Sequence, residues 1–321
     1  MTSKYKRFLK RLIVSKAPEG LFPPETKAFW MESRDLEGYQ GHIGIAYIEK
    51  ACTLHPVDKN KTIVHQYDEL ILLVGTNPED MLDLGGEATI IIGEEREEYL
   101  FQESTVIAIP RKTPHGPLKI EKLGRPMINI ILSNSPSYSA DFLSCSLQTS
   151  KGLKYSDHVK RLFTSKSAYE TWLSQGPVKI DERGVMDLRS ASRPGESYQI
   201  VQMTPEDLKG INISFSWEFF KTTGTWMSTR YAHVHPEPEL LAFLSLDPSR
   251  IDDLGASVEF WFGSEREVYV IDRPTLVTIP RPWIPHTPVV TQRVDRPFAF
   301  MLVVPGTYSF AGYVETGDDV Y

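Results

Sequence analysis

The segment His233-Val234-His235-Pro236-Glu237-Pro238-Glu239 decides how this sequence is interpreted. Two histidines stand two positions apart, and a glutamate follows the second histidine by four positions. Side chains two apart on a strand lie on the same face, so His233 and His235 are expected to project together. The prolines bend the chain, which lets Glu239 open the next strand with its carboxylate directed back toward the imidazoles.

A third imidazole ends a proline-rich turn, Ile279-Pro280-Arg281-Pro282-Trp283-Ile284-Pro285-His286. Nitrogen and oxygen ligands of this kind suit Mn, Fe or Zn, with Ni and Co as further candidates, and geometry rather than affinity selects among them. Buried His and Glu side chains are costly without a partner. We therefore expect His233, His235, Glu239 and His286 to bind one divalent transition metal. The alternative is that these histidines are ordinary core or surface residues.

The chain contains an internal repeat, which is the strongest evidence for its architecture. Shifting the sequence by 170 positions places His65 on His235 and Glu69 on Glu239. The same shift pairs Asp83-Leu84-Gly85 with Asp253-Leu254-Gly255, Glu95-Arg96-Glu97 with Glu265-Arg266-Glu267, and Ile109-Pro110-Arg111 with Ile279-Pro280-Arg281. One extra residue in the second copy then places His115 on His286. The chain is therefore two copies of one domain.

Each copy is predicted to be all-β. Short apolar runs bounded by Gly, Pro, Asn and Asp recur in both copies, as is typical of sandwiches and small barrels. The runs cover residues 70–74, 88–92 and 105–109 in the first copy, and 240–246, 257–262 and 275–279 in the second. Between the copies, apolar residues at mixed helical spacing predict a helix within 155–173, followed by a Ser/Arg/Pro/Gly-rich loop around 190–196.

These patterns divide the chain into four parts. They are an N-terminal arm (1–40), a first barrel (41–140), a connector (141–210) and a second barrel (211–321). The arm is expected to be exposed or to form a short helix. Its apolar run Leu12-Ile13-Val14 is too short for a signal peptide or a membrane span.

Composition excludes several classes of protein. Hydrophobic residues are 41% and charged residues 24% of the 321, which is the profile of a soluble globular chain with a real core. A net charge of −7, with no basic patch, gives no reason to expect nucleic acid or a membrane as a partner. Two cysteines, Cys52 and Cys145, cannot build a disulfide framework or a Cys-based zinc site. Without an export signal, we expect a cytoplasmic protein.

The His-x-His-x3-Glu segment, followed by a Pro-rich turn ending in His, resembles the two motifs of the cupin superfamily. The resemblance covers both copies, so the chain is similar to bicupins such as oxalate decarboxylases and quercetin dioxygenases. It implies two tandem all-β cupin barrels (double-stranded β-helix, or jelly-roll) with a partly helical connector. It also implies His233, His235, Glu239 and His286 as metal ligands. Cupin sheet edges often pair, so the resemblance leaves a homodimer open.

The first copy lacks one of these ligands, because Ile63 stands where His233 stands in the second copy. His65, Glu69 and His115 remain, and two histidines with one carboxylate can form a facial metal site. The alternative is a decayed site kept for its scaffold, which an Ile in the middle of the set favours. We therefore expect the chemistry in the second barrel, and a supporting or relic site in the first.

Four residues near the second ligand set are candidates for catalysis or substrate binding: Tyr231, Glu237, Arg281 and Trp283. An arginine can hold a carboxylate or enolate with two parallel hydrogen bonds, and a tyrosine or glutamate can move protons. Arg281 has a repeat partner in Arg111, so a structural role for it stays open.

The resemblance implies a metal-dependent enzyme acting on a small, oxygen-rich, chelating substrate. Non-oxidative cleavage of a carbon–carbon bond in an enolisable 1,3-dicarbonyl or carboxylate, by a hydrolase or decarboxylase, is favoured. Arg281, Glu237 and Tyr231 supply the acid–base and anion-holding groups for it. An iron-dependent dioxygenase of a small enol or phenol would use the same ligands. A cupin that binds a metal or a sugar without catalysis is the alternative that is not an enzyme. The fold alone does not distinguish these functions.

Overall fold

The computed structural model describes residues 3–146, 148–174, 176–191, 195–226, 232–281, 284–307 and 312–313. Within these ranges the chain forms one eight-stranded and three six-stranded sheets. The strands pair antiparallel, and the predicted apolar runs form strands in both copies; 105–109 and 275–279 coincide with β9 and β23. The all-β prediction is therefore confirmed.

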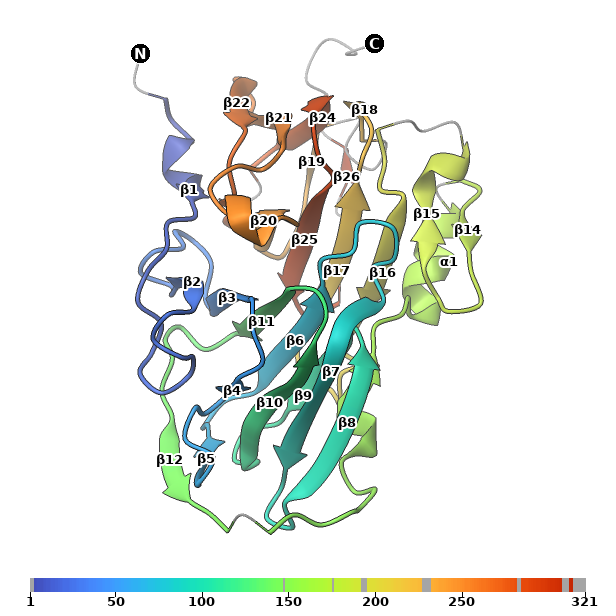
Figure 1. Cartoon of the computed structure of the whole chain (residues 1–321). Coiled ribbons are helices and arrows are strands. Elements are labelled where there is room, and N and C mark those ends of the chain that lie inside the picture. Colours follow the sequence, from blue (N-terminus) through green and yellow to red (C-terminus); the bar gives the residue numbers. More distant parts are fainter. Residues whose placement is uncertain are drawn as a thin grey trace.

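The first barrel consists of two facing sheets, in the lower half of Figure 1. One contains β13 (Val159–Arg161), β9 (Thr105–Ile109), β6 (Glu69–Gly75), β11 (Met127–Ser133), β3 (His42–Ile48) and β2 (Lys27–Met31). The other contains β12 (Asp141–Ser144), β5 (Lys61–Val64), β10 (His115–Leu123), β7 (Asp83–Ile92) and β8 (Glu97–Glu103), with β4 (Thr53–Leu54) beside β10. Ile71, Ile90 and Ile107 belong to the apolar core between them.

The second barrel repeats this arrangement. Its large sheet runs β1 (Leu9–Arg11), β23 (Thr275–Ile279), β20 (Glu239–Ser245), β25 (Phe298–Pro305), β17 (Ile213–Phe220), β16 (Gln199–Met203), β15 (Met186–Asp187) and β14 (Lys179–Ile180). The facing sheet runs β22 (Glu267–Ile271), β21 (Ala256–Phe262), β24 (His286–Val294), β19 (His233–Val234) and β26 (Gly312–Tyr313), with β18 (Gly224–Thr225) beside β24. Phenylalanines such as Phe243, Phe260 and Phe298 dominate the core between these sheets.

The two barrels pack against each other through the outer face of one sheet each. In the first barrel this is the sheet that contains β6 and β11, and in the second it is the eight-stranded sheet. Side chains alternate across a strand, so β6 places Ile71 inside the first barrel and Leu72 outside it. Leu72 shares one apolar cluster with Trp217 of the second barrel, which is fully buried. Tyr47 donates a hydrogen bond to the Ser245 carbonyl across this interface at 2.7 Å. A continuous core therefore links the two copies.

The N-terminal segment is not an exposed arm. A 3₁₀ turn, η1 (Lys6–Phe8), leads into β1, which pairs with β23 of the second barrel. Tyr5, Phe8 and Leu12 are only 6%, 3% and 3% exposed. The Tyr5 ring stacks on Phe262 at a centroid distance of 5.3 Å. The expectation of exposure was wrong because Tyr5 and Phe8 join the core of the second barrel, and Leu12 joins the apolar cluster between the barrels.

Residues 154–162, which we call the middle arm, repeat residues 4–12 of the N-terminal arm. Both read Lys-Tyr, then four residues, then Lys-Arg-Leu. The middle arm contains β13, which pairs with β9 of the first barrel. Lys154 Nζ lies 2.6 Å from Glu95, and Lys4 Nζ lies 2.6 Å from its repeat counterpart Glu265. The N-terminal arm, which precedes the first barrel in sequence, therefore docks on the second barrel. The middle arm, which precedes the second barrel, docks on the first.

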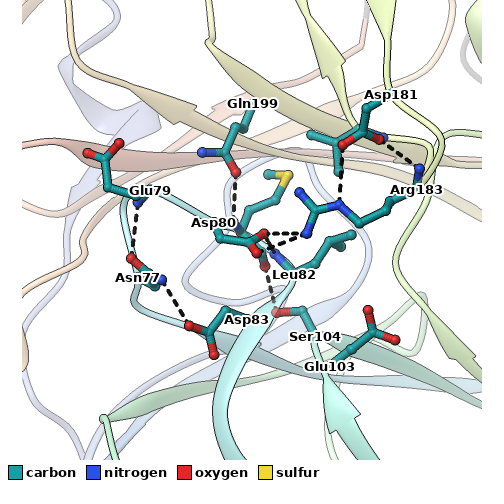
Figure 2. Close-up of polar contacts among 12 residues, drawn as sticks. Asn77, Glu79, Asp80, Leu82, Asp83, Glu103, Ser104, Asp181, Arg183 and Gln199 are labelled. Carbon is teal, nitrogen blue, oxygen red and sulfur yellow. Dashed lines mark hydrogen bonds and ion pairs between the residues drawn. The ribbon is translucent and has the colours of Figure 1, made fainter.

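The described part of the connector contains one α-helix, α1 (Lys166–Ser174), which is shorter than predicted. Residues 159–161 form β13 instead, because the edge of β9 offers them strand partners. Beyond α1 the connector contacts the loop between β6 and β7 through an ion pair and hydrogen bonds, as Figure 2 shows. Arg183 pairs with Asp80 at 2.9 Å, and the Met81 amide donates to Gln199 Oε1 at 2.7 Å.

Candidate metal centres

The predicted ligands of the second barrel come together at one end of its core. His233 on β19 lies directly opposite His286, the first residue of β24. Their ring centroids are 4.5 Å apart, and the His235 ring lies 4.7 Å from that of His233. Glu239 opens β20, as the sequence predicted. All four side chains are buried.

The carboxylate of Glu239 lies between two imidazoles. Its oxygens are 3.2 Å from His235 Nε2 and 3.3 Å from His286 Nε2. His286 Nδ1 donates to the Ile284 carbonyl at 3.1 Å, which leaves the Nε2 lone pair facing the carboxylate. Burial lowers the pKa of His286 to about 4, so this imidazole is neutral at pH 7. Ligand atoms of His233, His235 and His286 lie within 4.8 Å of one another, which suits a shared ion.

The first barrel contains a corresponding triad of His65, Glu69 and His115, whose ligand atoms also lie within 4.8 Å of one another. Each side chain is at most 2% exposed. Glu69 Oε2 is 3.4 Å from His65 Nε2 and 3.6 Å from His115 Nε2.

The orientation of this triad fits a metal ion. His65 Nδ1 donates to the Ser139 carbonyl at 2.7 Å, and His115 Nδ1 donates to the Thr113 carbonyl at 3.2 Å. Metal-binding histidines are oriented by such bonds from the second ring nitrogen. Both Nε2 atoms and Glu69 Oε1 are buried with no hydrogen-bond partner among the described residues. Buried polar atoms are rarely left so, and a cation between them would satisfy all three.

Ile63 occupies the register position of the missing ligand. It lies opposite His115 across β5 and β10, as His233 lies opposite His286 across β19 and β24. Its side chain is fully buried. The substitution inferred from the repeat therefore has its structural counterpart, and three candidate ligands remain in the first barrel.

The other predicted site residues are placed differently. Arg281 and Glu237 contact each other as an ion pair, with side chains 56% and 35% exposed. Arg111 and Asp68 form a similar pair in the first barrel at 3.1 Å. Both pairs tie the turn before the last histidine to the loop before the glutamate. Tyr231 and Trp283 lie outside the described residues.

Two further residues, His42 and Tyr138, lie close to the first triad. His42 is the first residue of β3 and is 1% exposed. Tyr138 follows β11, and its ring lies 5.2 Å from that of His65. Neither belongs to a spaced motif, so only the strand register and the path of the loop after β11 bring them to the triad.

Replacing Arg281 with alanine should have little effect on folding. The pair with Glu237 is exposed to solvent, and such pairs contribute about 0–1 kcal/mol. We expect a small shift in urea unfolding and unchanged metal content. Arg111→Ala is the matched control in the first barrel. Metal loss in Arg281→Ala alone would show that the pair positions the His286 turn.

None of the described helices has the length and apolar character needed to cross a membrane.

Comparisons with known proteins bear on the fold. No protein-family model matches the sequence, and no curated protein matches it. A solved oxalate decarboxylase, studied for its substrate binding mode and reaction specificity, matches with 12% identity and a TM-score of 0.56, over 94% of this chain and 78% of that chain. The Bacillus subtilis oxalate decarboxylase at pH 4.6 matches with 13% identity and a TM-score of 0.53, over 93% and 76%. The protein therefore has the two-barrel cupin, or bicupin, fold.

Proposed function

We propose that this protein is a metal-dependent lyase that cleaves a carbon–carbon bond of a small, oxygen-rich carboxylate without oxidation, as a decarboxylase does. One observation carries the proposal. In both barrels a buried glutamate lies between two imidazole Nε2 atoms. Two solved structures that share the fold are oxalate decarboxylases, which supports this reaction class over hydrolysis.

Each barrel provides one candidate metal site. His233, His235, Glu239 and His286 would hold one divalent metal, and His65, Glu69 and His115 a second; Mn, Fe and Zn are the first candidates, followed by Ni and Co. When bound, such a metal would supply a Lewis acid for the substrate oxygens and for the negative charge left on the substrate as CO2 departs. The surrounding apolar cores exclude water from both sites.

The first barrel is the better place for a chelating substrate. A metal held by fewer protein ligands keeps more coordination positions open for a chelating substrate. In the first barrel a buried Ile63 stands in place of one histidine and leaves three candidate ligands, whereas the second barrel has a cluster of three histidines with Glu239 beside two of them. We therefore place substrate binding in the first barrel, in contrast to the sequence-based expectation, and assign the second a supporting role.

The test combines metal content with turnover. We expect about two metals per chain in the wild type and about one in either Glu69→Gln or Glu239→Gln, because each removes a charged ligand from one cluster. Release of CO2 from oxalate and from small 2-oxo and 3-oxo acids should be equal in air and under nitrogen. Glu69→Gln should lower it at least about 100-fold.

Two outcomes would contradict the proposal. Wild-type protein that retains no metal after purification in metal-supplemented buffer would remove its basis. Turnover that consumes O2 in step with substrate would identify a dioxygenase instead. Glu239→Gln is the matched control, since its substitution is the same and its cluster lies in the other barrel.

A further inference from the structure

The first barrel contains buried polar atoms beside the triad that a metal held by the triad would not satisfy. His42 lies on the face of β3 that also carries Ala46, so it projects into the first-barrel core. His42 Nε2 and the Tyr138 hydroxyl are both buried and have no hydrogen-bond partner among the described residues. Two such atoms at one end of an apolar core indicate a ligand rather than a packing role.

We propose that His42 and Tyr138 bind a hydroxyl group of the molecule chelated at the triad, so that the first barrel takes a small hydroxylated carboxylate or enol in preference to one without a hydroxyl. This inference rests on the proposed function and adds the substrate class to it.

The tautomer of His42 sets what it can bind. Its Nδ1 donates to the Ser135 carbonyl at 2.9 Å, so in the neutral ring Nε2 is an acceptor only. The ring is held in place by Trp30, stacked at 5.7 Å, and by the edge contact with Tyr67 at 5.4 Å. His42 therefore presents a fixed lone pair, and its ligand must supply a proton.

Tyr138 lies beside both His42 and His65 of the triad. Its ring centroid is 5.9 Å from that of His42 and 5.2 Å from that of His65. An edge contact with Trp30 at 5.4 Å fixes the ring. Its hydroxyl can donate to a ligand oxygen that also gives its own proton to His42. A substrate hydroxyl meets both requirements, whereas an ionised carboxylate only accepts and leaves His42 unsatisfied.

His42 is a neighbour of the metal cluster rather than its fourth ligand. Its ligand atoms do not belong to the group that lies within 4.8 Å in the described structure. Nevertheless, its ring contacts those of Tyr67 and Tyr138, and both of these contact the ring of His65. It is placed to contact a molecule held by the metal, not to take the position that Ile63 occupies.

The test compares two probes that differ in one donor. Glycolate and methoxyacetate offer the same chelating oxygens, but only glycolate carries a hydroxyl proton. Calorimetric titration of metal-loaded Glu239→Gln protein, where the first barrel alone retains metal, should show glycolate binding at least about tenfold tighter. Tyr138→Phe and His42→Phe should each reduce that preference to within about threefold, with metal content unchanged.

A structural role would give different results. Because the Tyr138 hydroxyl has no partner in the described structure, Tyr138→Phe should leave the unfolding midpoint of the metal-free protein unchanged or raised. A lowered midpoint, or a glycolate preference that neither substitution alters, would overturn the inference, as would metal loss in His42→Phe. Protein that binds metal but shows no preference refutes this inference alone. Protein that binds no metal refutes the proposed function, and this inference with it.

Discussion

Deletion of residues 1–12 should lower the free energy of unfolding by on the order of 5 kcal/mol. Tyr5, Phe8 and Leu12 are almost completely buried, and each such side chain contributes about 1.5–3 kcal/mol through its apolar surface. The deletion also exposes the edge of β23, which β1 covers through three residue pairs. Because a domain is usually stable by only about 5–15 kcal/mol, this loss is expected to unfold much of the second barrel.

Point substitutions separate burial from chain length in this prediction. Phe8→Ala should cost about 3 kcal/mol, because the ring is 3% exposed and packs on Phe262 at 5.8 Å. Ile13→Ala is the control, since that side chain is 69% exposed and should change stability by less than about 0.5 kcal/mol. Urea unfolding of the two variants checks the difference. Equal midpoints would show that the N-terminal arm is not part of the folded core.

The repeat predicted the barrels well but missed the arms for a physical reason. The apolar runs bounded by turn residues predicted central strands of both barrels, because those strands are buried and regular. Residues 4–12 and 154–162 resemble each other too, but at a spacing of 150 rather than 170 positions. A search at one shift does not find them. Their strand conformation also depends on partners in the other copy, so residues 159–161 looked helical from sequence alone.

For the candidate sites, too, residues within one segment could be predicted from their spacing, whereas residues brought in by strand pairing could not. His233, His235 and Glu239 were predictable because their spacing within one segment sets their direction. The fourth candidate ligand, His286, ends a separate proline-rich turn, and its register with His233 brings it to the other three. His42 and Tyr138 reach the first triad only through the pairing of β3 with β11, which no local pattern encodes.

Glu218→Gln should stabilise the protein above pH 7 by as much as about 3 kcal/mol. Glu218 lies on β17, is 8% exposed, and faces the second-barrel core. Burial raises its pKa from 4.5 to about 7, and the nearby carboxylate of Glu196 adds to the rise. The folded state therefore binds a proton that the unfolded state has released. The associated stability is fully present below pH 4.5 and is lost as the pH rises to about 7.

Glutamine keeps the local contact while it removes the charge. Ser216 Oγ donates to Glu218 Oε1 at 2.6 Å, and the amide oxygen of glutamine can accept the same bond. Unfolding free energies should therefore be similar for the variant and the wild type near pH 4.5 and diverge up to pH 8, with the variant more stable. Glu206→Gln, which changes an exposed carboxylate, should follow the wild type throughout. Parallel profiles for Glu218→Gln and the wild type would mean that Glu218 is already ionised at pH 5 in the folded barrel, which would require solvent or a cation beside it.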